Sequence, residues 1–118
     1  MSTRCNVHFN ACGTTCANIY VHSDGYPDGP HGIPERISRF YQELESQTKD
    51  TRYSDPEYLA AKFLVWQASQ YARNEKAPLG FLSVAPCVED HGDIEYVYTV
   101  DCETLDQSGR PTVTWKKV

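Results

Sequence analysis

Apolar and polar residues alternate in several short stretches of the chain, and this alternation predicts β-strands. Between residues 3 and 11 the apolar positions Cys5, Val7 and Phe9 are separated by polar ones. The same two-residue alternation returns in residues 17–22, 94–101 and 112–118. A further strand is indicated by a short apolar run at residues 81–85. We expect the first two strands to form a hairpin closed by residues 12–16.

Two longer stretches have the three-to-four-residue period of an amphipathic helix. The first begins at Pro34, which suits the first turn of a helix, and runs to about residue 47 with an apolar face of Ile37, Phe40, Tyr41 and Leu44. The second follows the capping sequence 54–57 and runs to about residue 73. Its apolar stripe contains Leu59, Phe63, Trp66 and Gln70.

The predicted order of elements is therefore β-β-α-α-β-β-β. Strands grouped at both ends of a chain, with helices between them, favour an α+β fold. We expect a two-layer structure in which one mostly antiparallel sheet packs against two helices. With 118 residues and no internal repeat, the chain is expected to form a single domain over residues 1–118.

Composition and charge narrow the classes of function. A formal net charge of -5, without a local basic patch, disfavours general binding to nucleic acid. No apolar run approaches the ~20 residues of a membrane helix, and the N-terminal residues lack the apolar core of a signal peptide. We therefore expect a cytoplasmic protein without a membrane partner. Five Cys residues in such a chain predict free thiols, with Cys87 and Cys102 as ordinary buried or edge thiols.

Residues 22–34, here called the 22–34 loop, hold the most unusual chemistry of the chain. Three Gly and three Pro exclude regular structure and favour a defined turn that runs into the first helix. Free backbone N–H groups and the helix dipole could hold a phosphate or carboxylate there, assisted by Arg36 and Arg39. Asp24 and Asp28 would repel such an anion, and the P-loop pattern is absent. The alternative interpretation is a rigid structural turn.

Metal and nucleophilic chemistry have weaker support. A divalent cation could be bound by four residues of the 22–34 loop, His22, Asp24, Asp28 and His31. If the two loops meet, the site would be completed by His91, Asp93 and Glu95. Four residues near the N-terminus have the types of a zinc site: Cys5, His8, Cys12 and Cys16. In a strand the first two point to opposite faces, which disfavours that site. There is no Gly-x-Ser-x-Gly elbow, and we predict no catalytic residue, no metal and no cofactor.

Tyrosines lie on or beside the strands that neighbour this loop. The rings of Tyr20, Tyr26, Tyr96 and Tyr98 could stack on a flat, nucleotide-like ligand, and their hydroxyls could orient it. The alternative interpretation, which the sequence favours, is a Tyr-rich rim of the core. The predicted ligand-binding residues are His22, Asp24, Tyr26, Asp28, Arg36, Glu95 and Tyr98.

Three segments, spread in order along the chain, form a pattern: Thr-Arg-Cys-Asn at 3–6, Tyr-Val-His-Ser-Asp-Gly-Tyr-Pro-Asp-Gly at 20–29, and Asp-Ile-Glu-Tyr-Val-Tyr-Thr-Val-Asp at 93–101. With these segments the chain resembles a loose group of small uncharacterised proteins of bacteriophages and prophages. The resemblance implies a non-catalytic accessory protein in the host cytoplasm. Such a protein binds and neutralises a host component, either a defence protein or a nucleotide-like signal molecule.

Two other functions remain open at this point. One is a small metal-dependent hydrolase or nuclease that uses His22, Asp24 and Glu95. The other is a structural or virion-associated interaction protein, which would form a stable homo-oligomer. Binding of the acidic chain to a basic partner, in the manner of a nucleic-acid mimic, is a further form of inhibition.

Overall fold

The observed order of elements agrees with the predicted order. A computed structural model describes residues 3–74, 82–85 and 89–118. Within them the two helices and the strands follow one another as ββααβββ. The bounds are β1 Cys5–Ala11, β2 Thr14–Val21, α1 Ile33–Gln47, α2 Pro56–Asn74, β3 Leu82–Ala85, β4 Tyr96–Leu105 and β5 Pro111–Lys117.

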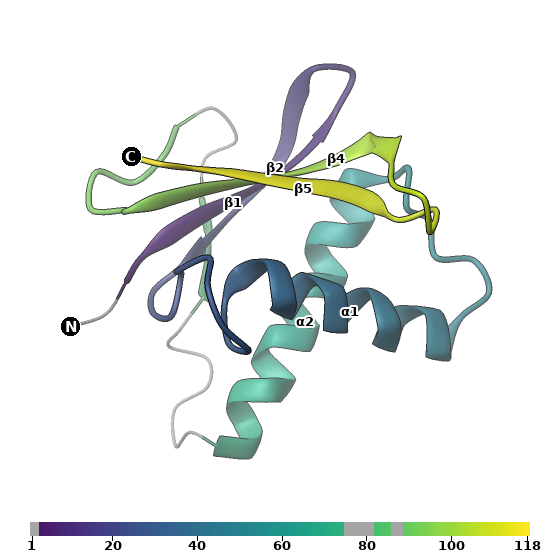
Figure 1. Cartoon of the computed structure of the whole chain (residues 1–118), viewed down its shortest axis with the longest axis horizontal. Helices are drawn as coiled ribbons and strands as arrows, with labels where there is room; N and C mark the ends of the chain where they lie inside the picture. The colour runs from purple at the N-terminus through teal and green to yellow at the C-terminus, as the bar shows by residue number, and fades with distance from the viewer. Residues whose placement is uncertain (1–2, 75–81, 86–88) are drawn as a thin grey trace.

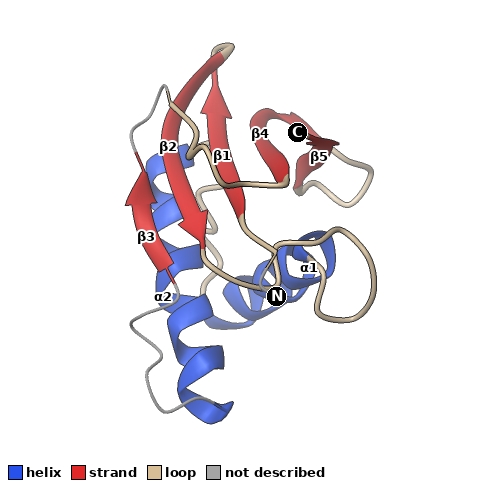
Figure 2. Cartoon of the chain, turned by 90° about the vertical axis from the view of Figure 1, so that its left-hand side faces the viewer, coloured by secondary structure: helices blue, strands red, loops and turns tan. Residues whose placement is uncertain are grey.

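The strands form one mixed sheet with the order β3-β2-β1-β4-β5. Only β1 and β4 are parallel among the pairs in this described sheet, and the other neighbours are antiparallel. Both helices lie on the same side of the sheet (Figure 1, Figure 2). The fold is therefore α+β with a mostly antiparallel sheet, as predicted.

The first hairpin is tighter than the sequence suggested. Its turn contains only Cys12 and Gly13, whose φ angles of 53° and 68° suit a two-residue turn of the primed type. β2 consequently begins at Thr14, and Cys16 is the extra residue of a bulge opposite Phe9 and Asn10. Two expectations, a strand start at residue 81 and a thiol at Cys87, lie outside the described residues.

The core fills the space between the sheet and the helices. Cys5, Val7 and Phe9 point into it from β1, as their alternation predicts. Phe63 of α2 packs against Phe9 and Phe40, with ring centroids 5.9 and 5.5 Å apart. The buried side chains of the helices include the following: Ile33, Ile37, Phe40, Tyr41 and Leu44 from α1, and Leu59, Ala60 and Phe63 from α2.

The opposite face of the central strands is polar but also buried. Asn6 of β1 donates to the side-chain oxygen of Asn18 of β2 at 3.0 Å, and both residues are almost fully enclosed. Residues 89–95 cover this pair. The backbone N–H of His91 donates to Asn6, and Asn18 donates to the carbonyl of Glu89. Because buried amides need partners, the polar residues of β1 and β2 hold this segment on the sheet.

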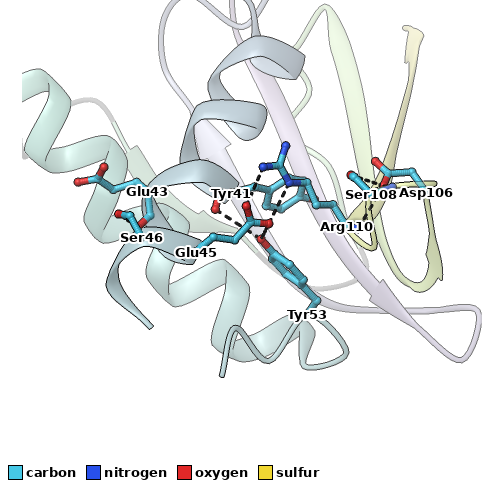
Figure 3. Close-up of polar contacts among 8 residues, drawn as sticks. All are labelled: Tyr41, Glu43, Glu45, Ser46, Tyr53, Asp106, Ser108 and Arg110. Atoms are coloured by element: carbon cyan, nitrogen blue, oxygen red, sulfur yellow. Dashed lines mark hydrogen bonds and ion pairs between the residues drawn. The ribbon is translucent and has the colours of Figure 1, made fainter. Parts of the chain in front are cut away.

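A polar clamp ties the β4–β5 hairpin to the helical layer (Figure 3). Arg110 donates to both carboxylate oxygens of Glu45, at 2.9 and 2.7 Å, and Tyr53 donates to the same carboxylate at 2.6 Å. Tyr41 of α1 donates to the carbonyl of Pro111 at 3.0 Å. A two-bond Arg–carboxylate pair has a fixed geometry, so the clamp sets where the hairpin meets α1.

The clamp predicts a pH dependence of stability. Hydrogen bonds from Arg110 and Tyr53 hold the pKa of Glu45 below its ordinary value of 4.5. A carboxyl whose pKa is lower in the folded state stabilises the fold above pH 4.5, and that contribution is lost as pH falls toward the folded-state pKa. On acidification, the unfolding free energy of Glu45→Gln should therefore fall by less than that of the wild type. The difference should stay under about 1 kcal/mol because the pair is partly exposed.

Urea denaturation of the wild type and of Glu45→Gln across this pH range measures the effect. Glu43→Gln is the matched control, because this neighbouring exposed carboxylate of α1 bonds only within its own helix among the described contacts. Equal acid sensitivity of Glu45→Gln and the wild type would show that the pair contributes nothing.

Candidate functional site

The backbone of the 22–34 loop is held by hydrogen bonds from inside the protein. Gly25 donates its N–H to the carbonyl of Thr3 at 2.8 Å, and its own carbonyl accepts from the buried Tyr98 hydroxyl at 2.7 Å. Farther along, Ile33 donates to the carbonyl of Tyr26 at 2.9 Å, which closes the loop on itself. These bonds leave little backbone freedom to the loop.

Arg36 reaches back from α1 into the same loop. Its Nε donates to the carbonyl of His31 at 2.8 Å, and its Nη2 donates to the carbonyl of Asp24. The side chain is only 6% exposed. Arg36 was predicted to assist an anion, but its guanidinium instead binds the loop's own carbonyl groups.

Two glycines let the loop pack this closely. A Cβ at Gly25 would lie 2.9 Å from both Cβ and Sγ of Cys5, and a Cβ at Gly32 would lie 2.7 Å from the carbonyl oxygen of Asp28. Rotation of a side chain cannot relieve the contact with Cβ of Cys5 or the contact with the backbone oxygen of Asp28. The spacing of Gly and Pro therefore reflects close packing of the loop, in agreement with the prediction of a defined turn.

The start of α1 has few groups left for an anion. Gly32 donates its N–H to the carbonyl of Gly29, Ile33 donates to Tyr26, and Pro34 has no N–H. The carboxylates of Asp24 and Asp28 lie on the same loop. A phosphate would find few backbone donors and little positive charge here, because the N–H groups and the Arg36 guanidinium already bind carbonyl groups of the loop.

The loop instead presents side chains to solvent. Asp24, Asp28 and His31 are exposed, and Tyr26 is half-buried. Asp24 has a φ of 59°, a left-handed conformation that Asp tolerates better than most residues. The result is a fixed backbone beneath an acidic outer surface.

His22 joins this loop to the segment 89–95 at the ring of Tyr20. The His22 ring centroid lies 4.5 Å from that of Tyr20, and His91 stacks on Tyr20 at 3.8 Å with an interplanar angle of 15°. The two loops therefore meet, through two histidine rings that both contact the ring of Tyr20. Tyr20 is only 6% exposed, so its ring is not available to stack on a ligand in this conformation.

The Tyr20 hydroxyl is bound by Asp93, which lies in the same segment. It donates to the carboxylate at 2.9 and 2.8 Å, and Arg4 lies 3.4 Å from one of the carboxylate oxygens. Burial, and then this hydrogen bond, raise the pKa of Tyr20, while the bond from Tyr20 lowers the pKa of Asp93. This group was not predicted from the sequence. Its signal was the alternation of Asn18, Tyr20 and His22 along β2 and the residue that follows it.

His22 should titrate below the ordinary histidine pKa of 6.5. Burial is the main cause, and the charges of Arg4 and His91 add to it. Since the unfolded chain binds this proton more readily, His22 contributes stability above pH 6.5 that is lost as pH falls toward the folded-state pKa. Arg4→Gln should raise the pKa of His22. The ring resonances followed by NMR between neutral and acid pH measure both values, and an unchanged midpoint in Arg4→Gln would contradict the assignment.

The remaining predicted residues occupy separate places. Tyr98 lies in the core beneath the loop, with its hydroxyl on Gly25. Glu95 is exposed and sits beyond Arg4, to whose carbonyl its N–H donates at 2.8 Å. Because residues 3–4 run between the loop and Glu95, the structure does not gather Asp24 and Glu95 into one site. No three His, Cys, Asp or Glu side chains among residues 3–74, 82–85 and 89–118 are placed to hold a metal ion.

The cysteines are free thiols in the part of the chain that the structure describes. Burial raises the pKa of Cys5 and of Cys102 to about 12, so neither is a reactive thiolate at neutral pH. Cys5 faces the core while His8, on the other face of β1, bonds to Asp90 at 2.5 Å. The separation of Cys5 and His8 across the strand agrees with the argument against zinc.

No helix among the described residues has the length and hydropathy needed to cross a membrane.

Comparisons with known proteins add no functional assignment. A scan against protein-family models, a search of the curated proteins and a search of the solved structures each found no match to this chain.

Proposed function

We propose that this chain is a non-catalytic accessory protein of the phage type, which binds and neutralises a host protein through the 22–34 loop. One observation carries the proposal: Arg36 and Tyr98 hold the loop backbone from inside, while Asp24, Asp28 and His31 remain accessible on it. A loop that is already ordered loses little conformational entropy on binding. Rigidly supported surface loops are also where binding residues concentrate.

The chemistry of the loop favours a protein partner over a nucleotide. Its outer carboxylates, Asp24 and Asp28, would attract a basic protein surface and repel phosphates. The N–H groups of Gly32 and Ile33, which would otherwise hold a phosphate at the start of α1, are donated within the loop, and Pro34 has no N–H. We place the action of the protein in the cytoplasm of the host cell, where the resemblance to phage accessory proteins leads us to expect it.

Site-specific photo-crosslinking in host cells tests this proposal. A photoreactive amino acid at Asp28 should crosslink one host protein, whereas the same residue at Lys49, in the connection between α1 and α2, should not. Affinity of the purified pair should then fall at least about tenfold in the double variant Asp24→Asn and Asp28→Asn, with a weaker dependence on salt.

Three results would overturn the proposal. No crosslinked protein at Asp28, or identical products at Asp28 and Lys49, would show that the loop does not select a partner. A nucleotide that raises the melting temperature of the wild type and fails to do so for the double variant would assign the loop to a small ligand instead.

A further inference from the structure

We propose that two copies of this chain associate through their β5 strands, which pair antiparallel about a two-fold axis. β5 is the last strand of the sheet, and its side away from β4 has no strand partner among the described residues. A free edge of this kind is a template for pairing with another strand. This interaction is distinct from the proposed binding by the 22–34 loop.

The outward backbone groups of β5 follow from its pairing with β4. Val118 donates its N–H to the carbonyl of Glu95 at 2.9 Å. In an antiparallel ladder the bonded residues alternate, so Thr112, Thr114 and Lys116 bond toward β4. The N–H and C=O groups of Val113, Trp115 and Lys117 therefore point away from the sheet. Pairing between 112 and 117 has no register shift, and Pro occurs only at the first position of the strand.

An exposed tryptophan lies in the middle of this edge. Trp115 is 50% exposed, although its ring packs 6.4 Å from the ring of Tyr98. Val113 lies on the same face of the strand and packs partly against the core. Large aromatic side chains of this kind are enriched at protein interfaces and dominate their binding energy.

The strand is complementary to itself when the two-fold axis passes through Thr114. Val113 then lies opposite the partner's Trp115, and the two exchange paired backbone hydrogen bonds because both point outward. Each Trp115 ring is covered on its exposed side by an apolar neighbour. Lys116 lies opposite the partner's Thr112, so no like charges face each other directly.

Charge also favours this edge. Residues 111–118 contain two Lys and no Asp or Glu, in a chain whose net charge is -5. Two copies therefore meet with less repulsion here than through an acidic surface. Antiparallel pairing further sets Lys117 beside the turn that carries the partner's Asp106, a residue exposed in each copy. The basic end of each hairpin thus meets the acidic end of the other.

Sedimentation of the whole chain over a range of concentrations provides the first test. The wild type should have a dimer component with twice the mass of one chain. Trp115→Lys should weaken dimerisation at least about tenfold, since it removes the central apolar contact and adds charge. Val84→Lys is the matched control, because Val84 is an exposed apolar residue of β3 at the opposite edge of the sheet.

Disulfide trapping tests the register directly. In the proposed pairing Thr114 faces its own copy as a non-hydrogen-bonded pair, with Cα atoms about 4.5 Å apart, which suits a disulfide. In a Cys12→Ser, Cys16→Ser background, Thr114→Cys should form covalent dimers on mild oxidation, whereas Lys116→Cys should not. Disulfide trapping does not use the Trp115→Lys variant, so it tests the dimer even if that variant fails to fold.

A wild type that stays monomeric would overturn the inference, as would a dimer broken by Val84→Lys or left intact by the folded Trp115→Lys variant. Equal trapping of Thr114→Cys and Lys116→Cys would overturn the proposed register. Each of these results leaves host-protein crosslinking at Asp28 unaffected, so failure of the dimer is distinguishable from failure of the proposed function.

Discussion

Arg36→Met is expected to lower the free energy of unfolding by about 2–4 kcal/mol, because two carbonyl groups lose their buried donor at once. Those carbonyls belong to His31 and Asp24, near opposite ends of the 22–34 loop. Methionine fills much of the same volume without a donor. The loss therefore reports the hydrogen bonds of the guanidinium more than its packing.

Urea denaturation compared with Arg39→Met measures this effect. Arg39 lies on the same helix and is half-exposed, so its replacement should change stability by no more than about 0.5 kcal/mol. Arg36→Met should also speed hydrogen exchange of the Ile33 amide, which closes the loop through Tyr26. Equal stabilities of the two variants would show that Arg36 does not hold the loop.

Gly32→Ala is expected to cost about 1–3 kcal/mol, since the added methyl group would meet backbone atoms that cannot rotate away. Its Cβ would lie 2.7 Å from the Asp28 carbonyl oxygen and 2.8 Å from that of Pro27. To admit the methyl group, residues 27–28 of the loop must move away from Gly32, the N-cap residue of α1. Affinity for any partner of the loop should fall together with stability.

Gly92→Ala is the matched control for this substitution. A Cβ at Gly92 has no neighbour within 4 Å, and its backbone does not have the positive φ that would strain alanine. Thermal denaturation should therefore separate the two variants clearly, with the lower melting temperature for Gly32→Ala. Indistinguishable melting temperatures would mean that the close approach at Gly32 is not maintained in solution.

Local patterns in the sequence predicted the elements because each depends on neighbouring residues. The period of Ile37, Phe40 and Leu44 fixed the buried face of α1, and the alternation of Val7 and Phe9 fixed the core side of β1. The parallel pairing of β1 with β4 could not be found in this way, since alternation is the same for parallel and antiparallel strands. The early start of β2 depended on a left-handed Cys12, which sequence does not signal as glycine does.

For the candidate site, the sequence predicted the course of the chain better than the partners of its side chains. Gly and Pro marked the 22–34 loop as a defined turn. The meeting of the two loops, left as a condition by the sequence, occurs where His22 and His91 pack on Tyr20. The position of Arg36 near a helix start indicated anion binding, but its burial depends on the path of a loop that turns back over it. Whether an arginine faces a ligand or the protein's own carbonyls is a tertiary property, and no local spacing carries it.

Rigidity of the 22–34 loop is the property on which the proposed function depends most directly. Backbone ¹⁵N relaxation by NMR measures it at Gly25, Asp28 and Gly32, with the amides of α1 as an internal reference. We predict order parameters near 0.85 at these loop positions, about the value of rigid backbone in helices. Values below about 0.6 would describe a flexible loop and would contradict a preformed binding surface.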